Sequence, residues 1–266
     1  MDVNADLGEG CGDDASMLTI VTSANVAAGA HAGGGDLLLA TVERAIAEGV
    51  QVGAHISYRD VENFGRISHA DSAGPDMLRD LVEQIHLVRA ATLQFGKDIS
   101  HVKPHGALYH DAASTLPIAR LVMQSIRIAA DEAAREPWPI LTMPSRHVAE
   151  LGKEFGIRLV AEAFADRAYE ADGSLVPRSQ PHSVHQDADQ VVAQALEIAQ
   201  THSVLASEGQ RIPVVAQSIC LHGDTPGAVN LALAVTSALS ENGKEQGSMG
   251  VAIADYDHSG GWSIFV

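Results

Sequence analysis

Side chains that can do acid–base chemistry or bind a ligand follow apolar segments at several places in this 266-residue chain. Asp6 and Glu9 follow the first apolar segment. Histidines follow four others, at His31, His55, His105 and His222. Because the carboxyl ends of parallel strands meet at one end of a sheet or barrel, this placement predicts a single site shared by several strands.

The two carboxylates after the first strand are candidates for catalysis. Paired carboxylates whose surroundings push their pKa values apart can divide the work of general acid and general base. In the alternative interpretation, Asp6 caps the following turn and Glu9 is solvated.

The histidines suggest a second chemistry. Each one alone is typical of a hydrogen-bonded structural residue, but four at equivalent positions predict that at least two face the site. Two of His31, His55 and His105 could form a two-histidine, one-carboxylate metal site with Asp6, leaving positions open for substrate. The sequence has no HExxH motif, so a divalent metal is compatible with the pattern but not required by it.

The segment 23–35 is rich in glycine and contains Asn25 and His31. Glycines allow close approach of the backbone to a ligand, and their N–H groups can hold an anion or an oxyanion. The GKS/GKT ending of a P-loop is absent, and GEGCG at 8–12 does not match the dinucleotide fingerprint. Nucleotide binding by this chain is therefore not predicted.

Lys103 ends a buried strand in the sequence HVKPHGALYH. A buried lysine must pair with an anion or lower its pKa. It could hold a substrate carboxylate or stabilise an oxyanion. The alternative is an ion pair with a core acid such as Glu162.

Two later segments add candidate binding residues. Glu162, Asp166 and Arg167 lie around one loop, and a planar guanidinium group such as that of Arg167 is well suited to bind a carboxylate. The sequence CLHGDTP then offers His222 and Asp224, although Asp224 is an equally good candidate for a helix N-cap.

Apolar runs and amphipathic runs alternate along the chain. The expected strands are 1–6, 20–27, 50–55, 99–106, 139–143, 157–164 and 213–223. The longer expected helices between and after them are 36–49, 76–95, 114–135, 188–200 and 225–240. This alternation predicts parallel strands in one α/β domain over 1–243, with a tail over 244–266 that has no assignable structure. An open doubly wound sheet also fits, but functional groups after nearly every strand favour a barrel.

The composition excludes several classes of function. The formal charge is −17 and no basic stripe is present, which argues against nucleic acid as a partner. No apolar run reaches the length of a membrane span. Asp2, Asn4 and Asp6 stand where a signal peptide would carry basic residues, so we expect a cytoplasmic protein.

The motifs taken together resemble the LamB/YcsF family, which comprises the A subunits of 5-oxoprolinase. The matching stretches run in order over roughly the first 240 residues: NADLGE at 4–9, SAN and AGAHAG at 23–33, GAHISYRD and FGR at 53–66, HVKPHGALY at 101–109, FADRAYEADGSLVPR at 164–178 and CLHGDTP at 220–226.

The resemblance implies a distorted seven-stranded parallel barrel of the glycoside hydrolase/deacetylase type. It also implies opening of the lactam of 5-oxo-L-proline to L-glutamate, coupled to ATP hydrolysis by separate partner subunits, which agrees with the missing P-loop. The chain departs from the family pattern at Ala28, Ala30, Gly34, Gly35 and the pair Arg66-Ile67. These departures remove bulk and charge beside the expected pocket, so the identity of the lactam stays open.

Three hypotheses follow. In the first, Asp6 or Glu9, with His55, activates water, while Lys103 or glycine N–H groups stabilise the oxyanion and Arg167 or Arg66 holds the substrate carboxylate. The second is a metal-dependent amide hydrolase or deacetylase that needs no ATP. The third is a non-catalytic subunit that binds a small acid inside a larger complex; a homo-oligomer also stays open. The expected substrate-binding residues are Asn25, His31, Arg66, His105, Glu162, Asp166, Arg167, His222 and Asp224.

Overall fold

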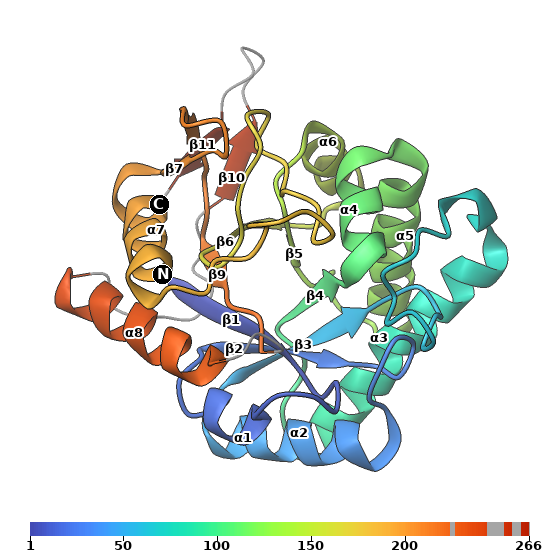
Figure 1. Ribbon diagram of the computed structural model, residues 1–266. Helices are drawn as coiled ribbons and strands as arrows, with labels where there is room; N and C mark the ends of the chain where they lie inside the picture. Colours follow the sequence, from blue (N-terminus) through green and yellow to red (C-terminus); the bar gives the residue numbers. More distant parts are fainter. Residues whose placement is uncertain (224–226, 244–252, 257–261, 266) are drawn as a thin grey trace.

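The computed structural model describes residues 1–223, 227–243, 253–256 and 262–265. The centre of the fold is a closed barrel of seven parallel strands with helices around it (Figure 1). In order around the barrel, the strands are β1 (Asp2–Leu7), β2 (Ser23–Ala27), β3 (Gln51–Ile56), β4 (His101–Pro104), β5 (Ile140–Thr142), β6 (Leu159–Phe164) and β9 (Ser218–Cys220). This arrangement confirms the predicted barrel.

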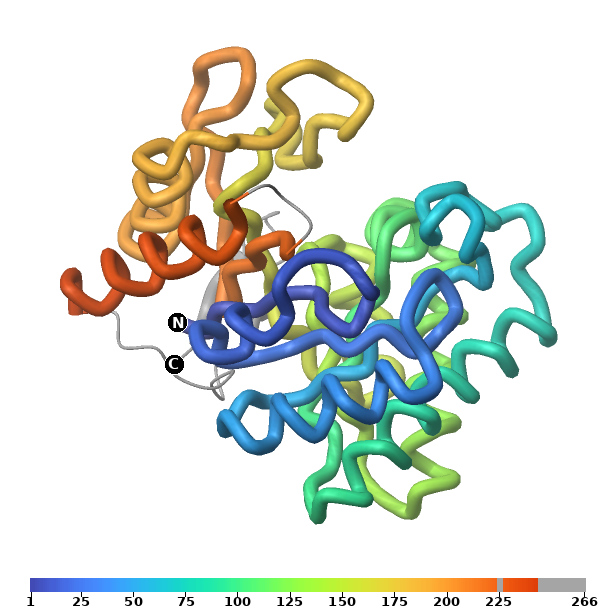
Figure 2. The backbone as a smooth tube through the Cα atoms, turned by 60° about the horizontal axis from the view of Figure 1, so that its bottom comes forward, coloured from blue at the N-terminus to red at the C-terminus, as the bar shows by residue number. Residues whose placement is uncertain are grey.

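The barrel closes between its first and last strands. β9 pairs with β1 on one side, where Asn4 faces Cys220, and with β6 on the other, where Glu162 faces Ser218. Figure 2 shows the same closure, with the dark blue start of the chain beside the orange-red segment that contains β9. Residues far apart in the sequence therefore share one barrel interior.

Helices cover the outside of the barrel because each carries one apolar stripe. They are α1 (Asp14–Met17), α2 (Gly35–Ala47), α3 (Pro75–Gln94), α4 (Gly106–Ser114), α5 (Leu116–Glu132), α6 (Arg146–Phe155), α7 (Ala188–Thr201) and α8 (Ala228–Glu241), with a 3-10 turn, η1 (Ala70–Ser72). In the part of the chain that the structure describes, no helix combines the length and the apolar character needed to cross a bilayer.

Several elements differ from the expectation. The expected strand 99–106 ends at Pro104, and α4 begins at Gly106. The expected strand 213–223 is shorter: Pro213 ends a hairpin of β7 (Ser203–Leu205) and β8 (Arg211–Pro213), and only Ser218–Cys220 form β9 in the barrel. The expected helix 114–135 begins only at Leu116, because the extended backbone of Thr115 separates α4 from α5. A short apolar run does not show which neighbour it will pair with, so the hairpin could not be separated from the barrel strand by periodicity.

The C-terminal tail contains an antiparallel pair of strands, β10 (Ile253–Tyr256) and β11 (Trp262–Phe265). β10 lies close to β6 and α6, outside the barrel ladder. The tail that had no assignable structure in the sequence thus adds a small two-stranded sheet, apart from the barrel and from the β7–β8 hairpin.

The glycine-rich segment after β2 packs tightly against the loop after β1. Gly33 has φ +71°, and a Cβ atom there would lie 2.1 Å from the carbonyl oxygen of Gly8. Gly96 has nearly the same φ, +72°, with no atom within 4 Å of the same position. The two glycines therefore have the same backbone requirement and very different surroundings.

We predict that Gly33→Ala destabilises the protein far more than Gly96→Ala. The left-handed backbone costs about 1–2 kcal/mol at either position. The collision with Gly8 adds about 1–3 kcal/mol or more at position 33 alone. The free energies of unfolding from urea titrations of both variants measure the difference, and equal losses would show that the loop contact does not constrain this end of the barrel.

Candidate active site

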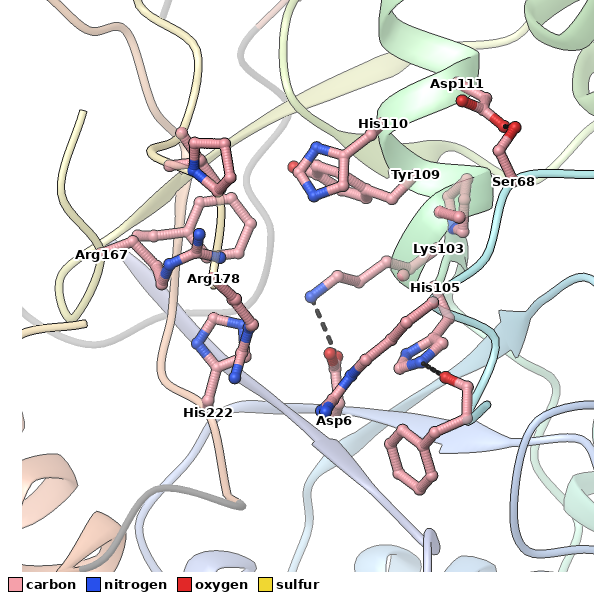
Figure 3. Close-up of a pocket in the computed structure, with 18 of the residues that line it drawn as sticks. Asp6, Ser68, Lys103, His105, Tyr109, His110, Asp111, Arg167, Arg178 and His222 are labelled. Carbon is pink, nitrogen blue, oxygen red and sulfur yellow. Dashed lines mark hydrogen bonds and ion pairs between the residues drawn. The ribbon is translucent and has the colours of Figure 1, made fainter. Parts of the chain in front are cut away.

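A pocket with a volume of about 390 Å³ opens where the barrel strands end. Figure 3 shows Arg167, Arg178 and His222 on one side and Lys103, His105, Tyr109 and His110 on the other, with Lys103 reaching toward Asp6. The lining residues come from the ends of β1, β4 and β6, from the start of α4 and from the loops that follow the strands. The structure therefore brings these residues together at one end of the barrel, where they were expected to meet.

Lys103 lies in the floor of the pocket and is almost completely buried. Its Nζ atom lies 2.9 Å from Asp6 Oδ1 and 2.8 Å from Glu162 Oε1, and it donates a hydrogen bond to Asn4 Oδ1 at 3.2 Å. Burial acts to lower the pKa of Lys103, but the nearby carboxylates outweigh it and raise the pKa well above its usual range. Lys103 is therefore a permanent cation, and the ion pair with Glu162 considered from the sequence is present together with one to Asp6.

Asp6 pairs with the Lys103 cation and also lines the pocket. Its Oδ1 atom also accepts a hydrogen bond from Asn25 Nδ2 at 2.8 Å, and its Oδ2 atom lies 3.3 Å from His55 Nε2. Burial acts to raise the pKa of Asp6, but the charges of His55 and Lys103 outweigh it and hold the pKa well below its ordinary value. Asp6 is thus ionised and oriented on both of its oxygens.

Asn25 lies beneath the pocket, where it positions Asp6. Its side chain accepts a hydrogen bond from His101 Nε2 at 2.6 Å, and burial lowers the pKa of His101 to about 3. Asn4 and His101 were missed by the sequence analysis. The signal was available, because each stands two residues before a predicted site residue and therefore points to the same face of its strand as Asp6 or Lys103.

Glu9 and three of the histidines form one cluster. Glu9 Oε1 lies 3.0 Å from His31 Nε2, 3.5 Å from His105 Nδ1 and 3.8 Å from His55 Nε2. His55 Nε2 lies 3.0 Å from His105 Nδ1, and the rings of His31 and His105 stack at 3.7 Å. Of the four predicted histidines, the cluster includes all but His222.

His222 belongs to the other side of the pocket, where its Nδ1 atom lies 2.9 Å from Asp166 Oδ2. Burial acts to raise the pKa of Asp166, but His222 outweighs it and the pKa lies below its ordinary value. This side therefore holds a buried carboxylate–imidazole pair. Asp224, the other candidate in this loop, lies outside the described residues.

Arg167 lines the pocket, and two of its five N–H donors are engaged by backbone carbonyls of the chain itself. Its Nε atom donates to the carbonyl of Ser183 at 3.1 Å and its Nη2 atom to the carbonyl of Val176 at 2.6 Å, so it ties together the loop 165–187. Burial lowers the pKa of Arg167 to about 10. Arg66 and Arg178 also line the pocket, and Arg66 stacks over the ring of Phe64 at 4.9 Å.

The glycine-rich segment supports the site from outside the pocket. Among the described lining residues there is none from 28–35, and Ala28 and Ala30 are buried. The backbone N–H groups of this segment were expected to stabilise an oxyanion. The residues that carry them, 28–35, are not among the described residues that line the pocket. Tyr109 and His110 line the pocket instead, one turn into α4, where the helical spacing after His105 could have identified them.

Comparisons with known proteins agree with this fold. The sequence profile of the LamB/YcsF family matches residues 1–253, so the chain belongs to this family. It is 42% identical over 250 residues to the A subunit of 5-oxoprolinase from Streptomyces griseus subsp. griseus, covering 92% of this chain and 98% of the relative. It is 42% identical over 248 residues to the protein of that name from Paracidovorax citrulli, covering 91% and 96%.

A solved structure is also similar. The crystal structure of the lactam utilization protein from Thermus thermophilus superposes with a TM-score of 0.81 at 34% identity, covering 91% of this chain and 97% of that one. The names of these relatives refer to 5-oxoprolinase and to lactam utilization.

We predict that Lys103→Met lowers the free energy of unfolding by about 3–5 kcal/mol, because it leaves Asp6 and Glu162 buried without their cation. Lys97→Met on the exposed surface is the matched control, with an expected change within about 0.5 kcal/mol. Adding Glu162→Gln to Lys103→Met removes one of the two unpaired charges and is expected to recover part of the loss.

The same substitution has a pH signature. The lowered pKa of Asp6 stabilises the folded wild type above its ordinary pKa, near 4, and this contribution is lost as the pH falls below it. The difference in unfolding free energy between wild type and Lys103→Met should therefore shrink between pH 7 and pH 3. A difference that stays constant with pH would contradict the ion-pair interpretation.

Proposed function

We propose that this LamB/YcsF chain binds 5-oxo-L-proline and opens its lactam ring to L-glutamate, with ATP hydrolysed by partner subunits. The observation that carries the proposal is the Lys103–Asp6 pair in the floor of a pocket that arginines also line. The substrate combines an uncharged amide with a carboxylate, so it needs both kinds of contact. The names of the relatives supply the identity of the lactam and describe those proteins as subunits.

Ring opening of a lactam needs an activated water, a group that stabilises the oxyanion and a proton for the departing nitrogen. Lys103 supplies a fixed positive charge, and stabilisation of developing charge by such preorganised groups is worth several kcal/mol of barrier. Asp6 is ionised, lines the pocket and can accept a proton from the attacking water. Its contact with His55 orients it and gives the proton a neighbouring site.

The substrate carboxylate is assigned to the arginines that line the pocket, Arg66, Arg167 and Arg178. Arg167 also donates from Nε and Nη2 to backbone carbonyls of its own loop, which holds its guanidinium group in place. A guanidinium group can bind a carboxylate through two parallel hydrogen bonds. Arg178 lies on the side of the pocket opposite His105, so a bound acid would have its amide toward Asp6 (Figure 3).

ATP is assigned to partner subunits for two reasons. The sequence contains no P-loop, and the described residues that line the pocket include no glycine-rich loop of the kind that cradles phosphates. The relatives are each named as one lettered subunit of 5-oxoprolinase, which implies further subunits in those proteins.

The test is formation of labelled glutamate from ¹³C-labelled 5-oxo-L-proline, followed by mass spectrometry. The purified chain is assayed alone and with the 5-oxoprolinase partner subunits of its own organism, each with and without ATP. The proposal expects glutamate and ADP only when chain, partners and ATP are all present. Turnover by the chain alone without ATP would favour an independent amide hydrolase, and no turnover in any mixture would contradict lactam opening.

We predict that Asp6→Asn lowers kcat for ring opening by about 100-fold or more, because the amide cannot accept a proton from water. The substitution keeps the size of the side chain and leaves Lys103 paired with Glu162, so the fold is expected to persist. Asp71→Asn, on an exposed turn, is the control and should keep wild-type kcat. A kcat for Asp6→Asn within about threefold of wild type would remove Asp6 from the proposed chemistry.

A further inference from the structure

The cluster of Glu9, His31, His55 and His105 has a surplus of lone pairs at its centre. Each residue contributes one potential metal-ligand atom, and these four atoms all lie within 4.8 Å of one another. The four residues come from three loops and one strand end that the barrel brings together, and three of them are buried histidines. Neither the fold nor the ion pair of Lys103 requires these rings to face one another.

The hydrogen bonds fix which nitrogen of two rings carries a proton. His55 Nδ1 lies 3.1 Å from the carbonyl oxygen of Lys103, and His105 Nε2 lies 3.0 Å from the carbonyl oxygen of Phe64. A carbonyl only accepts, so both of these nitrogens donate. In the neutral rings, His55 Nε2 and His105 Nδ1 therefore bear lone pairs, and these two atoms face each other at 3.0 Å.

Further acceptors surround the same point. His55 Nε2 also lies 3.3 Å from Asp6 Oδ2 and 3.8 Å from Glu9 Oε1. A second proton on His55 could be donated to only one of these acceptors at a time, and Glu9 Oε1 would still face the lone pair of His105 at 3.5 Å. A dication at the centre of the cluster would compensate all of these atoms together.

The electrostatics of the floor favour added positive charge. Among the described residues, three carboxyl groups lie in or next to the floor of the pocket: those of Asp6, Glu9 and Glu162. The ammonium group of Lys103 pairs with Asp6 and Glu162. The rings of His31 and His105 are buried and stack at 3.7 Å, and imidazole binds a metal through the lone pair of its neutral form.

We propose that His31, His55, His105 and Glu9 form a binding site for a divalent transition-metal ion of the Zn²⁺ class in the wall of the pocket. Ligand atoms around a tetrahedral Zn²⁺ lie about 3.3 Å apart, from bond lengths of about 2.0–2.1 Å. Four of the six separations, at 3.0, 3.0, 3.5 and 3.8 Å, bracket this value, and all of the ligand atoms lie within 4.8 Å of one another. The backbone carbonyls that hold His55 and His105 are the outer partners that metal-binding histidines use.

The carboxylate ligand differs from the sequence expectation. Asp6 was the expected partner of the histidines, but its oxygens are engaged by Lys103, Asn25 and His55. Glu9 Oε1 lies within 3.8 Å of a nitrogen of each of the three histidines. Glu9 and His105 line the pocket, so a bound ion would have one side open toward a substrate, next to Asp6.

The test measures metal binding without substrate, so its outcome is independent of lactam chemistry. Protein stripped with EDTA is titrated with Zn²⁺, and separately with Co²⁺, whose visible spectrum reports the coordination geometry. We expect one ion per chain at micromolar concentration or below. Glu9→Gln and His55→Ala should each weaken binding by about 100-fold or more. His86→Gln, at a partly exposed histidine paired with Glu132, should bind as wild type does.

A second measurement avoids dependence on the folding of variants. Histidine ¹⁵N resonances of the wild-type protein distinguish a ring nitrogen bound to a metal from one bound to a proton. We expect His55 Nε2 and His105 Nδ1 to shift on addition of Zn²⁺ while His55 Nδ1 and His105 Nε2 stay protonated. Absence of stoichiometric binding, or a His55 ring that keeps protons on both nitrogens in the presence of Zn²⁺, would overturn the proposal in favour of a shared proton.

Discussion

The structure depends on the burial of one ammonium group inside the barrel. Removing a charge from water costs several kcal/mol, and Lys103 remains charged only because Asp6 and Glu162 lie within 3 Å of it. Those two carboxylates come from β1 and β6, which become near neighbours only through β9. Closure of the barrel and the charge state of its floor are therefore the same constraint, and a site of this kind could not be built on an open sheet with the same strands.

This cation also determines what its neighbours can do. Asp6 stays ionised because Lys103 and His55 lie next to it, so it can accept a proton but has none to donate. His31 and His105 stay neutral because they are buried, so they can bind a cation or a substrate without adding charge. The floor thus separates into a part around the Lys103 cation and an electron-rich part around Glu9 and the histidines, with Asp6 at the boundary between them.

The sequence predicts this architecture well where a rule of period or position applies. Alternating strands and helices predicted the barrel, and functional residues after strands predicted that Asp6, His55, Lys103 and His105 would meet. The sequence could not predict that Glu9, rather than Asp6, would lie close to all three histidines. That contact depends on how the loop after β1 returns toward β3. The use of Arg167 within its own loop also depends on tertiary carbonyl positions that no local pattern encodes.

The two proposals assign different work to adjacent groups, and their compatibility follows from the positions of those groups. Asp6 Oδ1 faces Lys103, whereas Asp6 Oδ2 faces His55 at the edge of the histidine cluster. A cation in the cluster would add to the field that keeps Asp6 ionised, and it would lie across the pocket from Arg178 (Figure 3). An amide bound between these two sides would have positive charge near its oxygen and an oriented carboxylate near the attacking water. The proposed function assigns ATP to partner subunits, so the groups that would bind ATP need not lie in this barrel.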